Sequence, residues 1–276
     1  MSKIAVSLVV PVYNEADSIH TVLNEALAAL KQSCDAFEII AVNDCSTDDS
    51  AKTLATIDGI TVINHPTNKG YGASLKTGIF HSTYENIMII DADGTYPTAD
   101  IPRLVAHYSK HGFDMVVGSR DRNSEAIPLE RRHAKKFLNQ YASYLAQTHI
   151  PDINSGLRIF KKAIAEKYWS LFPERFSFTS TLTMTCLVHG YHVDFIPIEY
   201  YKRHARSTLK PSDFIRFLKL VTKLSFFFKP IRVFTPISIA LFLAALALWG
   251  LAVADILPTF YDATFIVLCA TALQTL

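Results

Sequence analysis

The segment ENIMIIDADG, residues 85–94, sets two aspartates two positions apart directly after a run of large apolar residues. In an extended backbone such side chains point to the same side, so Asp91 and Asp93 are expected to lie together where a buried strand ends. Paired carboxylates offer the hard oxygen ligands that Mg²⁺ and Mn²⁺ prefer. A metal held there could bridge the oxygens of a diphosphate and stabilise its charge as it leaves. In isolation, the same residues could equally form a turn or cap a helix.

Polar motifs follow four further apolar runs of the chain. The runs cover residues 5–10, 37–42, 60–63, 87–90 and 114–117, and helical patterns separate them. This alternation predicts an α/β fold, with a mostly parallel sheet covered by helices on both faces. The motifs that follow the runs are PVYNE, NDCSTDD, NKGYG, DADG and GSR, in chain order. Ligands on such sheets bind beyond the carboxyl ends of the strands, so the five motifs are expected to line one crevice. Taken together, they favour a metal site at Asp91 and Asp93 over a turn.

The C-terminal part of the chain is strongly apolar. Residues 236–254 contain no charged side chain. As a helix they would span about 28 Å, close to the hydrocarbon core of about 30 Å. We therefore predict one transmembrane helix in preference to a buried core helix, which would normally carry a polar stripe. A second apolar run from Ala263 is too short for a full span and is expected to be a truncated second helix of a hairpin.

Charge is distributed unevenly along the chain. Residues 1–201 carry a net charge of −4, residues 202–232 carry +8, and the remainder carries −2. The basic segment is amphipathic at helical spacing and leads into the apolar run, which favours a membrane-surface helix over a nucleic-acid-binding segment. A basic flank places that side of the membrane in the cytoplasm. We expect a cytoplasmic catalytic domain at 1–211, an interface helix at 212–229 and a transmembrane region at 230–276.

These motifs, together with VVGSR and DINSGLRIF, resemble those of family 2 glycosyltransferases with the GT-A, Rossmann-like fold. The resemblance covers about residues 4–211 and is specific to the polyprenyl-phosphate sugar synthases. It implies a membrane-bound enzyme that moves one sugar, with inversion, from GDP-mannose or a UDP-hexose to dolichyl or undecaprenyl phosphate. It also implies Mg²⁺ or Mn²⁺ as cofactor. The oligomeric state is open, a homo-oligomer included.

Two other classes of protein remain open. A processive polysaccharide synthase of the same family would add a longer membrane domain and a Gln-x-x-Arg-Trp type motif, which this sequence does not contain. A non-catalytic membrane scaffold would be expected to lose Asp91, Asp93 or Arg120, and all three are present.

The resemblance also implies roles for individual residues. The nucleotide base and ribose would be held by Pro11, Tyr13, Glu15, Val42 and Asp44. The diphosphate would be lined by Asp91, Ala92 and Asp93, with Asp93 as the main metal ligand. Arg120 and Arg203 would neutralise phosphate oxygens. Asp152 matches the position of a base proposed in relatives. Because a phosphate monoester is already mostly a dianion at neutral pH, Asp152 is expected to orient the acceptor.

Two positions depart from the family pattern. Thr95 stands where relatives often have a metal-binding glutamine, so a hydroxyl would be the third, weaker metal ligand. Thr208 stands where a lysine is expected. Arg206 or Lys210 would then supply the missing cation, and the sequence does not decide between them.

Overall fold

The structure is a computed structural model that describes residues 4–120, 139–175, 177–201, 222, 226, 230–253 and 262–274. The chain divides into two compact units, Met1–Leu218 and Lys219–Leu276. Each unit is described by itself.

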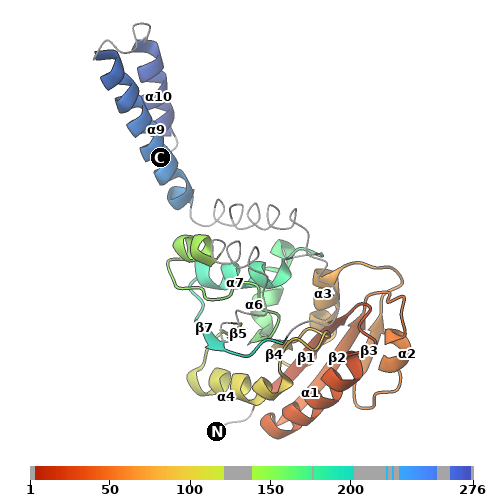
Figure 1. The fold of residues 1–276 in the computed structure, drawn as a ribbon. Helices are drawn as coiled ribbons and strands as arrows, with labels where there is room; N and C mark the ends of the chain where they lie inside the picture. Colours follow the sequence, from red (N-terminus) through yellow and green to blue (C-terminus); the bar gives the residue numbers. More distant parts are fainter. Residues whose placement is uncertain are drawn as a thin grey trace. The chain divides into compact units, whose positions relative to one another are not determined.

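The first unit is built on a seven-stranded mixed sheet with the order β3-β2-β1-β4-β6-β5-β7 (Figure 1). Its strands are β1 (Ala5–Val12), β2 (Ala36–Asn43), β3 (Thr61–Asn64), β4 (Asn86–Ile89), β5 (Met115–Ser119), β6 (Arg158–Lys161) and β7 (Val193–Pro197). The five predicted apolar runs form β1 to β5. Strand β6 runs antiparallel to its neighbours β4 and β5, and the other pairs are parallel. The predicted mostly parallel sheet is confirmed.

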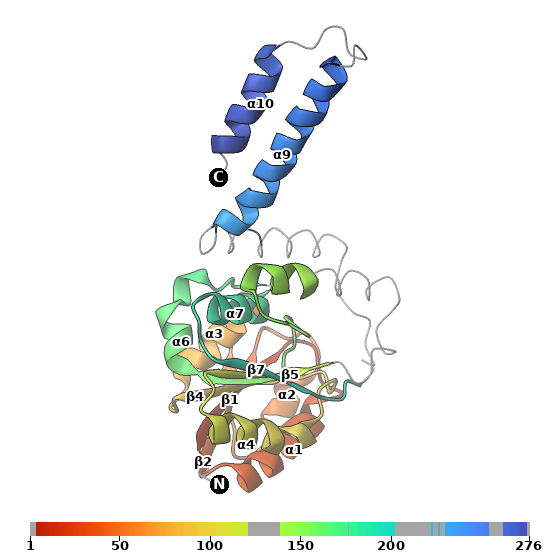
Figure 2. The same ribbon diagram turned by 90° about the vertical axis from the view of Figure 1, so that its left-hand side faces the viewer.

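Helices cover both faces of this sheet, as the sequence predicts (Figure 2). One face carries α1 (Ile19–Ser33) and α4 (Ile101–His111), and the other carries α3 (Tyr71–His81), α6 (Lys162–Lys167) and α7 (Phe178–Val188). Shorter turns are α2 (Ser50–Leu54), η1 (Thr98–Asp100) and η3 (Trp169–Leu171). Along β1, Leu8 and Val10 enter the first core and Val9 enters the second, because successive strand side chains point to opposite faces.

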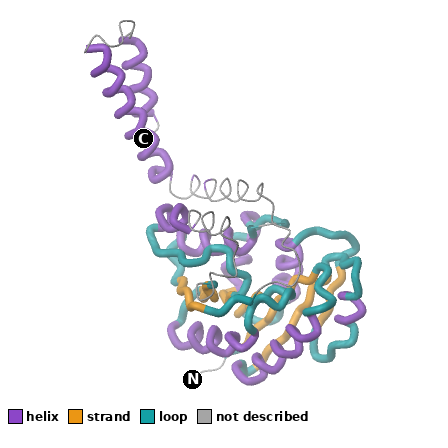
Figure 3. Tube along the Cα trace, viewed as in Figure 1, coloured by secondary structure: helices purple, strands orange, loops and turns teal. Residues whose placement is uncertain are grey.

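The carboxyl ends of five strands meet at one edge of the sheet. Strands β1 to β4 are parallel, and β4 and β5 are both antiparallel to β6, so β5 ends at the same edge as the others. The loops that follow β1 to β4 lead to α1, α2, α3 and, through η1, to α4 (Figure 3). The five sequence motifs therefore lie at the same edge, as predicted.

The second unit contains two helices, α9 (Pro230–Val253) and α10 (Asp262–Gln274), within its described residues. The two helices pack together, and the rings of Trp249 and Phe265 lie 6.3 Å apart between centroids. Residues Phe234–Leu251 have a mean hydropathy of 2.0, and 11% of them are buried. This segment is long and apolar enough to cross a membrane, and it overlaps the span predicted at 236–254.

Helix α3 packs unusually close to its neighbours at its first turn. A Cβ atom on Gly72 would lie 2.1 Å from the carbonyl oxygen of Pro173. The backbone N–H groups of Gly72 and Ala73 donate to the carbonyls of Arg175 and Glu174. These donors at the helix start, which could otherwise bind an anion, are therefore occupied within the chain. The glycine-rich NKGYG motif serves close packing at this point.

This packing predicts that Gly72→Ala destabilises the first unit by about 1–3 kcal/mol, because the added methyl group meets backbone atoms that have little room to move. The shift would be measured by thermal unfolding of the full chain in detergent. Phe80→Ala, on the same helix but with a side chain 74% exposed, is the control and should change stability little. Equal unfolding temperatures for Gly72→Ala and wild type would contradict the close approach.

Candidate active site

The two central aspartates lie on a turn that follows β4. Asp91 comes two residues after the strand, and the chain turns at Ala92 and Asp93 before Gly94, which has a φ angle of +69°. The sequence predicts an extended backbone through Asp93, but the extended segment ends before the turn at Ala92. The hydroxyl of Ser18 donates to the carbonyl oxygen of Ala92 at 2.7 Å and ties the turn to the start of α1.

Thr95 holds the side chain of Asp93. Its backbone N–H and its hydroxyl both donate to Oδ1 of Asp93, at 3.1 and 2.6 Å. Thr95 is buried, so its hydroxyl is well placed to fix the direction of this carboxylate. A donating hydroxyl still has lone pairs, and the expectation that Thr95 also binds a metal stays a prediction.

Asp91 is half-buried beside a second negative charge. Burial and the charge of Asp93 raise the pKa of Asp91 to about 6, while the hydroxyl of Tyr71 and the charges of Arg120 and Arg158 oppose this rise. The Tyr71 hydroxyl donates to Oδ1 of Asp91 at 2.8 Å. Although the backbone is not extended, the two carboxylates are therefore close enough to repel each other.

This carboxylate pair fits a divalent metal ion. A cation would relieve the repulsion between Asp91 and Asp93, and both offer hard oxygen ligands. Within the described part of the chain, no cluster of three or more histidine, cysteine, aspartate or glutamate side chains could hold a metal alone. Mg²⁺ is commonly bound by one or two carboxylates with the remaining ligands from substrate phosphates and water. The site therefore suits a metal that arrives with a phosphorylated substrate.

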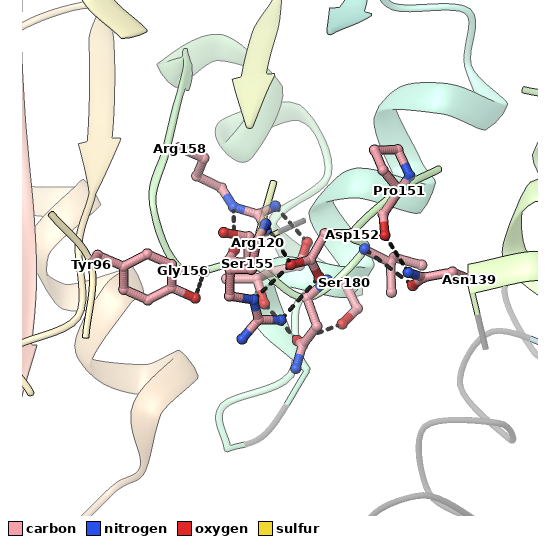
Figure 4. A network of polar contacts seen from close by, with 12 residues as sticks. Tyr96, Arg120, Asn139, Pro151, Asp152, Ser155, Gly156, Arg158 and Ser180 are labelled. Carbon is pink, nitrogen blue, oxygen red and sulfur yellow. Dashed lines mark hydrogen bonds and ion pairs between the residues drawn. The ribbon is translucent and has the colours of Figure 1, made fainter. Parts of the chain in front are cut away.

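The loop at residues 152–156 approaches the same turn. A Cβ atom on Gly156 would lie 2.5 Å from Oδ2 of Asp91, so a larger residue would require the Asp91 carboxylate to move. The N–H of Gly156 donates to the hydroxyl of Tyr96 at 2.6 Å, which anchors the loop (Figure 4).

Arg120 and Asp152 form one bidentate pair (Figure 4). Nε and Nη2 of Arg120 donate to the two oxygens of Asp152 at 2.6 and 2.9 Å, and the guanidinium lies over the ring of Tyr200 at 5.2 Å. Asp152 is fully buried. Both its oxygens are engaged by the guanidinium, so the geometry favours an orienting role for Asp152 over that of a base. The roles predicted for both residues remain predictions.

A second arginine, Arg158, lies fully buried below the site. Its guanidinium donates to the carbonyl of Thr179 at 2.7 Å, the hydroxyl of Thr183 at 2.9 Å and the carbonyl of Ser155 at 3.1 Å. All three partners are neutral. Burial lowers the pKa of Arg158, against the opposing influence of Tyr71 and other nearby groups. Its positive charge favours the ionised form of Asp91.

Sequence reasoning did not single out Tyr71 or Arg158. A signal was available for Arg158, because a charged residue within the apolar segment LRIF must be buried with specific partners if that segment is a strand. Tyr71 carries no such local signal, since its contact with Asp91 joins residues far apart in the sequence.

The residues predicted to hold the nucleotide lie on the first two strand-end loops. Pro11 and Val42 are register partners on β1 and β2. The side chain of Tyr13 is 47% exposed, so its ring is accessible for stacking on a base. Glu15 is half-buried, and its backbone N–H donates to the hydroxyl of Ser50 at 2.9 Å, which joins the two loops.

Asp44, also predicted to contact the nucleotide, already has several protein partners. Its Oδ1 accepts from the N–H of Lys69 at 2.8 Å and lies 2.7 Å from Nδ1 of His65. Its Oδ2 accepts from the N–H of Gly70 at 2.7 Å. Asp44 therefore secures the NKG loop after β3. A carboxylate has about four acceptor positions, so a further contact with a nucleotide stays a prediction.

Three predicted phosphate-binding residues, Arg203, Arg206 and Lys210, lie outside the described residues, as does Thr208. The predicted interface helix at 212–229 also lies outside them, except for residues 222 and 226. These predictions are left as they stand.

A mixed sheet with paired carboxylates at its loop edge is the arrangement of GT-A glycosyltransferases. The chain belongs to glycosyl transferase family 2, because the family's sequence model matches residues 7–169.

Similar proteins carry related names. The undecaprenyl-phosphate 4-deoxy-4-formamido-L-arabinose transferase of Klebsiella pneumoniae is 33% identical over 166 residues, which cover 58% of this chain and 50% of that protein. The chain thus spans half the length of that relative. A dolichyl-phosphate beta-glucosyltransferase of Trichomonas vaginalis is 28% identical over 249 residues, covering 83% of this chain and 73% of that protein.

Solved structures support the fold. Glucosyl-3-phosphoglycerate synthase from Mycobacterium tuberculosis, solved with Mn²⁺, UDP and phosphoglyceric acid, superposes with a TM-score of 0.64 at 15% identity. The similarity covers 80% of this chain and 78% of that chain. The predicted GT-A fold is confirmed.

The raised pKa of Asp91 leads to a prediction about stability. The folded state binds this proton more tightly than the unfolded state, so the stabilisation is present below the ordinary aspartate pKa and is lost as pH rises through about 6. Asp91→Asn does not titrate. In EDTA at about pH 8 it should therefore be more stable than wild type by about 1–3 kcal/mol, and the difference should vanish near about pH 4.

Thermal unfolding of the full chain across this pH range would measure the difference. Asp58→Asn, at an exposed position, is the matched control and should change stability little. If Asp91→Asn were no more stable than wild type under the alkaline condition, the carboxylates would not repel each other as the structure indicates.

Proposed function

We propose that the protein is a membrane-bound inverting glycosyltransferase that moves one sugar from a nucleotide diphosphate donor to a polyprenyl monophosphate. The observation that carries this proposal is the meeting of Asp91 and Asp93 with the Arg120–Asp152 pair at the loop edge of a GT-A sheet. Carboxylates that suit a metal, next to an oriented arginine, are the groups needed to stabilise a leaving diphosphate.

The names of the relatives support the choice of acceptor. One is an undecaprenyl-phosphate sugar transferase and another a dolichyl-phosphate glucosyltransferase. The donor is proposed to be GDP-mannose or a UDP-hexose. The structural neighbour solved with Mn²⁺ and UDP supports a metal-dependent reaction with a nucleotide sugar.

In the proposed reaction, an oxygen of the acceptor phosphate forms a bond to the anomeric carbon while the bond from that carbon to the donor diphosphate breaks. Asp91 and Asp93 would hold Mg²⁺ or Mn²⁺, which supplies positive charge for the diphosphate when bound. Thr95 directs Asp93, and Asp152 with Tyr200 directs Arg120. Because the acceptor phosphate is mostly a dianion at neutral pH, no strong base is needed. Arg203 and one of Arg206 and Lys210 are proposed as further phosphate ligands.

We further propose that α9 spans the bilayer with the catalytic unit on the cytoplasmic side. Support comes from the apolar segment Phe234–Leu251 and from the net charge of +8 on residues 202–232, which directly precede it. The bilayer would then present the polyprenyl acceptor to the catalytic unit.

The first test is a transfer assay with membranes that contain the full chain. Labelled UDP-glucose, UDP-GlcNAc and GDP-mannose would be incubated with undecaprenyl or dolichyl phosphate, and label in the organic phase would identify the donor. We expect Asp93→Ala, or excess EDTA, to lower the rate of sugar transfer by about 10²-fold or more, because the departing diphosphate would lose the metal that stabilises its negative charge. Asp58→Ala, an exposed aspartate, is the control. Full activity in EDTA would show that the reaction does not depend on a divalent metal. Label recovered in a polymer would favour a processive polysaccharide synthase.

A second test concerns the membrane. Leu243 lies near the middle of the segment Phe234–Leu251 and is exposed on α9, so Leu243→Arg should disfavour insertion by about 2.5–3.5 kcal/mol. Ile231→Arg, on the same helix but before that segment, is the control and should have a small effect. The inserted fraction would be measured in a membrane-insertion assay. Equal insertion of both variants would argue against α9 as a span.

A further inference from the structure

The loop at residues 152–156 joins two charged parts of the site. At its start, Asp152 holds Arg120 through both carboxylate oxygens. At its end, the backbone of Gly156 packs against the carboxylate of Asp91. Asn154 lies midway between these contacts, and its backbone N–H donates to Oδ1 of Asp152 at 3.2 Å.

The side-chain amide of Asn154 is held by the first turn of α7. Its Oδ1 accepts from the hydroxyl of Thr179 and from the hydroxyl of Ser180, both at 2.9 Å. Both hydroxyl residues are buried, so each hydroxyl hydrogen requires an acceptor. The orientation with Oδ1 toward α7 satisfies both hydrogens. In the reverse orientation Nδ2 would donate to the two hydroxyl oxygens, and the two hydroxyl hydrogens would lose this acceptor.

The orientation of the amide also fixes the position of Nδ2 of Asn154. With Oδ1 committed to α7, Nδ2 faces away from that helix, and among the described residues its two N–H groups have no hydrogen-bond partner. Asn154 is half-buried. A neutral donor that is oriented so strictly, on a loop between Arg120 and Asp91, is suited to bind an uncharged oxygen.

We propose that Nδ2 of Asn154 binds a hydroxyl or ring-substituent oxygen of the transferred sugar. This inference rests on the proposed function. During transfer the sugar lies between the leaving diphosphate and the acceptor phosphate. The loop spans a corresponding interval, from Gly156 beside Asp91 to Asp152 beside Arg120. Thr179 and Ser180 act as positioning residues, because their hydroxyl groups contact the amide oxygen of Asn154 and not Nδ2.

The test compares binding of a nucleotide with binding of the corresponding nucleotide sugar. Titration calorimetry of the full chain in detergent with Mn²⁺ would give Kd for UDP and UDP-glucose, and for GDP and GDP-mannose. In each pair, Kd for the nucleotide divided by Kd for the nucleotide sugar gives the contribution of the sugar to affinity. Asn154→Ala should reduce this ratio about 3- to 10-fold, the effect of one neutral hydrogen bond, while Kd for the nucleotide alone stays within about 2-fold.

Two further variants separate binding from folding. Asn154→Asp keeps an acceptor for Thr179 and Ser180 but offers no donor, so it should reduce the ratio at least as much while the loop stays in place. Ser155→Ala is the control in the same loop. The Ser155 hydroxyl is buried without a hydrogen-bond partner among the described residues, and its removal should leave the ratio unchanged.

The outcomes distinguish this inference from the function on which it rests. If wild-type protein transfers sugar to undecaprenyl phosphate but the Asn154 variants keep the wild-type ratio, the assignment of Asn154 is wrong and the proposed function stands. If nucleotide and nucleotide-sugar affinities fall equally in Asn154→Ala, Asn154 has a structural role only. If wild-type protein neither binds a nucleotide sugar nor transfers its sugar, both proposals fail.

Discussion

Two carboxylates held next to each other are the constraint around which the described site is organised. Burial and the charge of Asp93 raise the pKa of Asp91 to about 6, and three groups work against this rise: the Tyr71 hydroxyl, Arg120 and Arg158. A turn that served only the fold could avoid the repulsion with neutral residues at either position. Two repelling carboxylates, with a buried arginine that offsets part of the repulsion, are expected at a site that binds a cation.

Strand β6 brings the remaining groups to these carboxylates. It lies between β4 and β5 and runs antiparallel to both, so Arg158 at its start is the register partner of Ile89 and of Val117, near the ends of those strands. The loop before β6 must therefore arrive at the edge where Asp91 follows β4 and Arg120 follows β5. This topology explains why Asp152 meets Arg120 while Gly156 meets Asp91, although both come from one short loop.

The sequence predicts the parts of this arrangement that depend on local pattern. Apolar runs locate β1 to β5, and the order of strands and helices places their polar ends at one edge. The edge strand β7 escapes prediction because its sequence, VDFIP, is a short apolar run interrupted by Asp194, and most of its residues are not fully buried. The turn at Ala92 and the Tyr71–Asp91 hydrogen bond also escape prediction. They depend on contacts between distant segments, such as that from Ser18 to Ala92, which no local period reveals.

The charges of the described site are almost balanced before any substrate binds. Asp91, Asp93 and Asp152 face Arg120 and Arg158, but Arg120 is already paired with Asp152, and Arg158 is fully buried among neutral partners. A lipid phosphate alone brings a charge of about −1.5 to −2, and a donor diphosphate adds more. A site with no net positive charge cannot bind two polyanions side by side. In the proposed reaction, the additional positive charge would come from a divalent metal and from the basic segment at residues 202–232, which has a net charge of +8. On the proposed function, the basic segment would therefore supply charge for the reaction as well as mark the membrane flank.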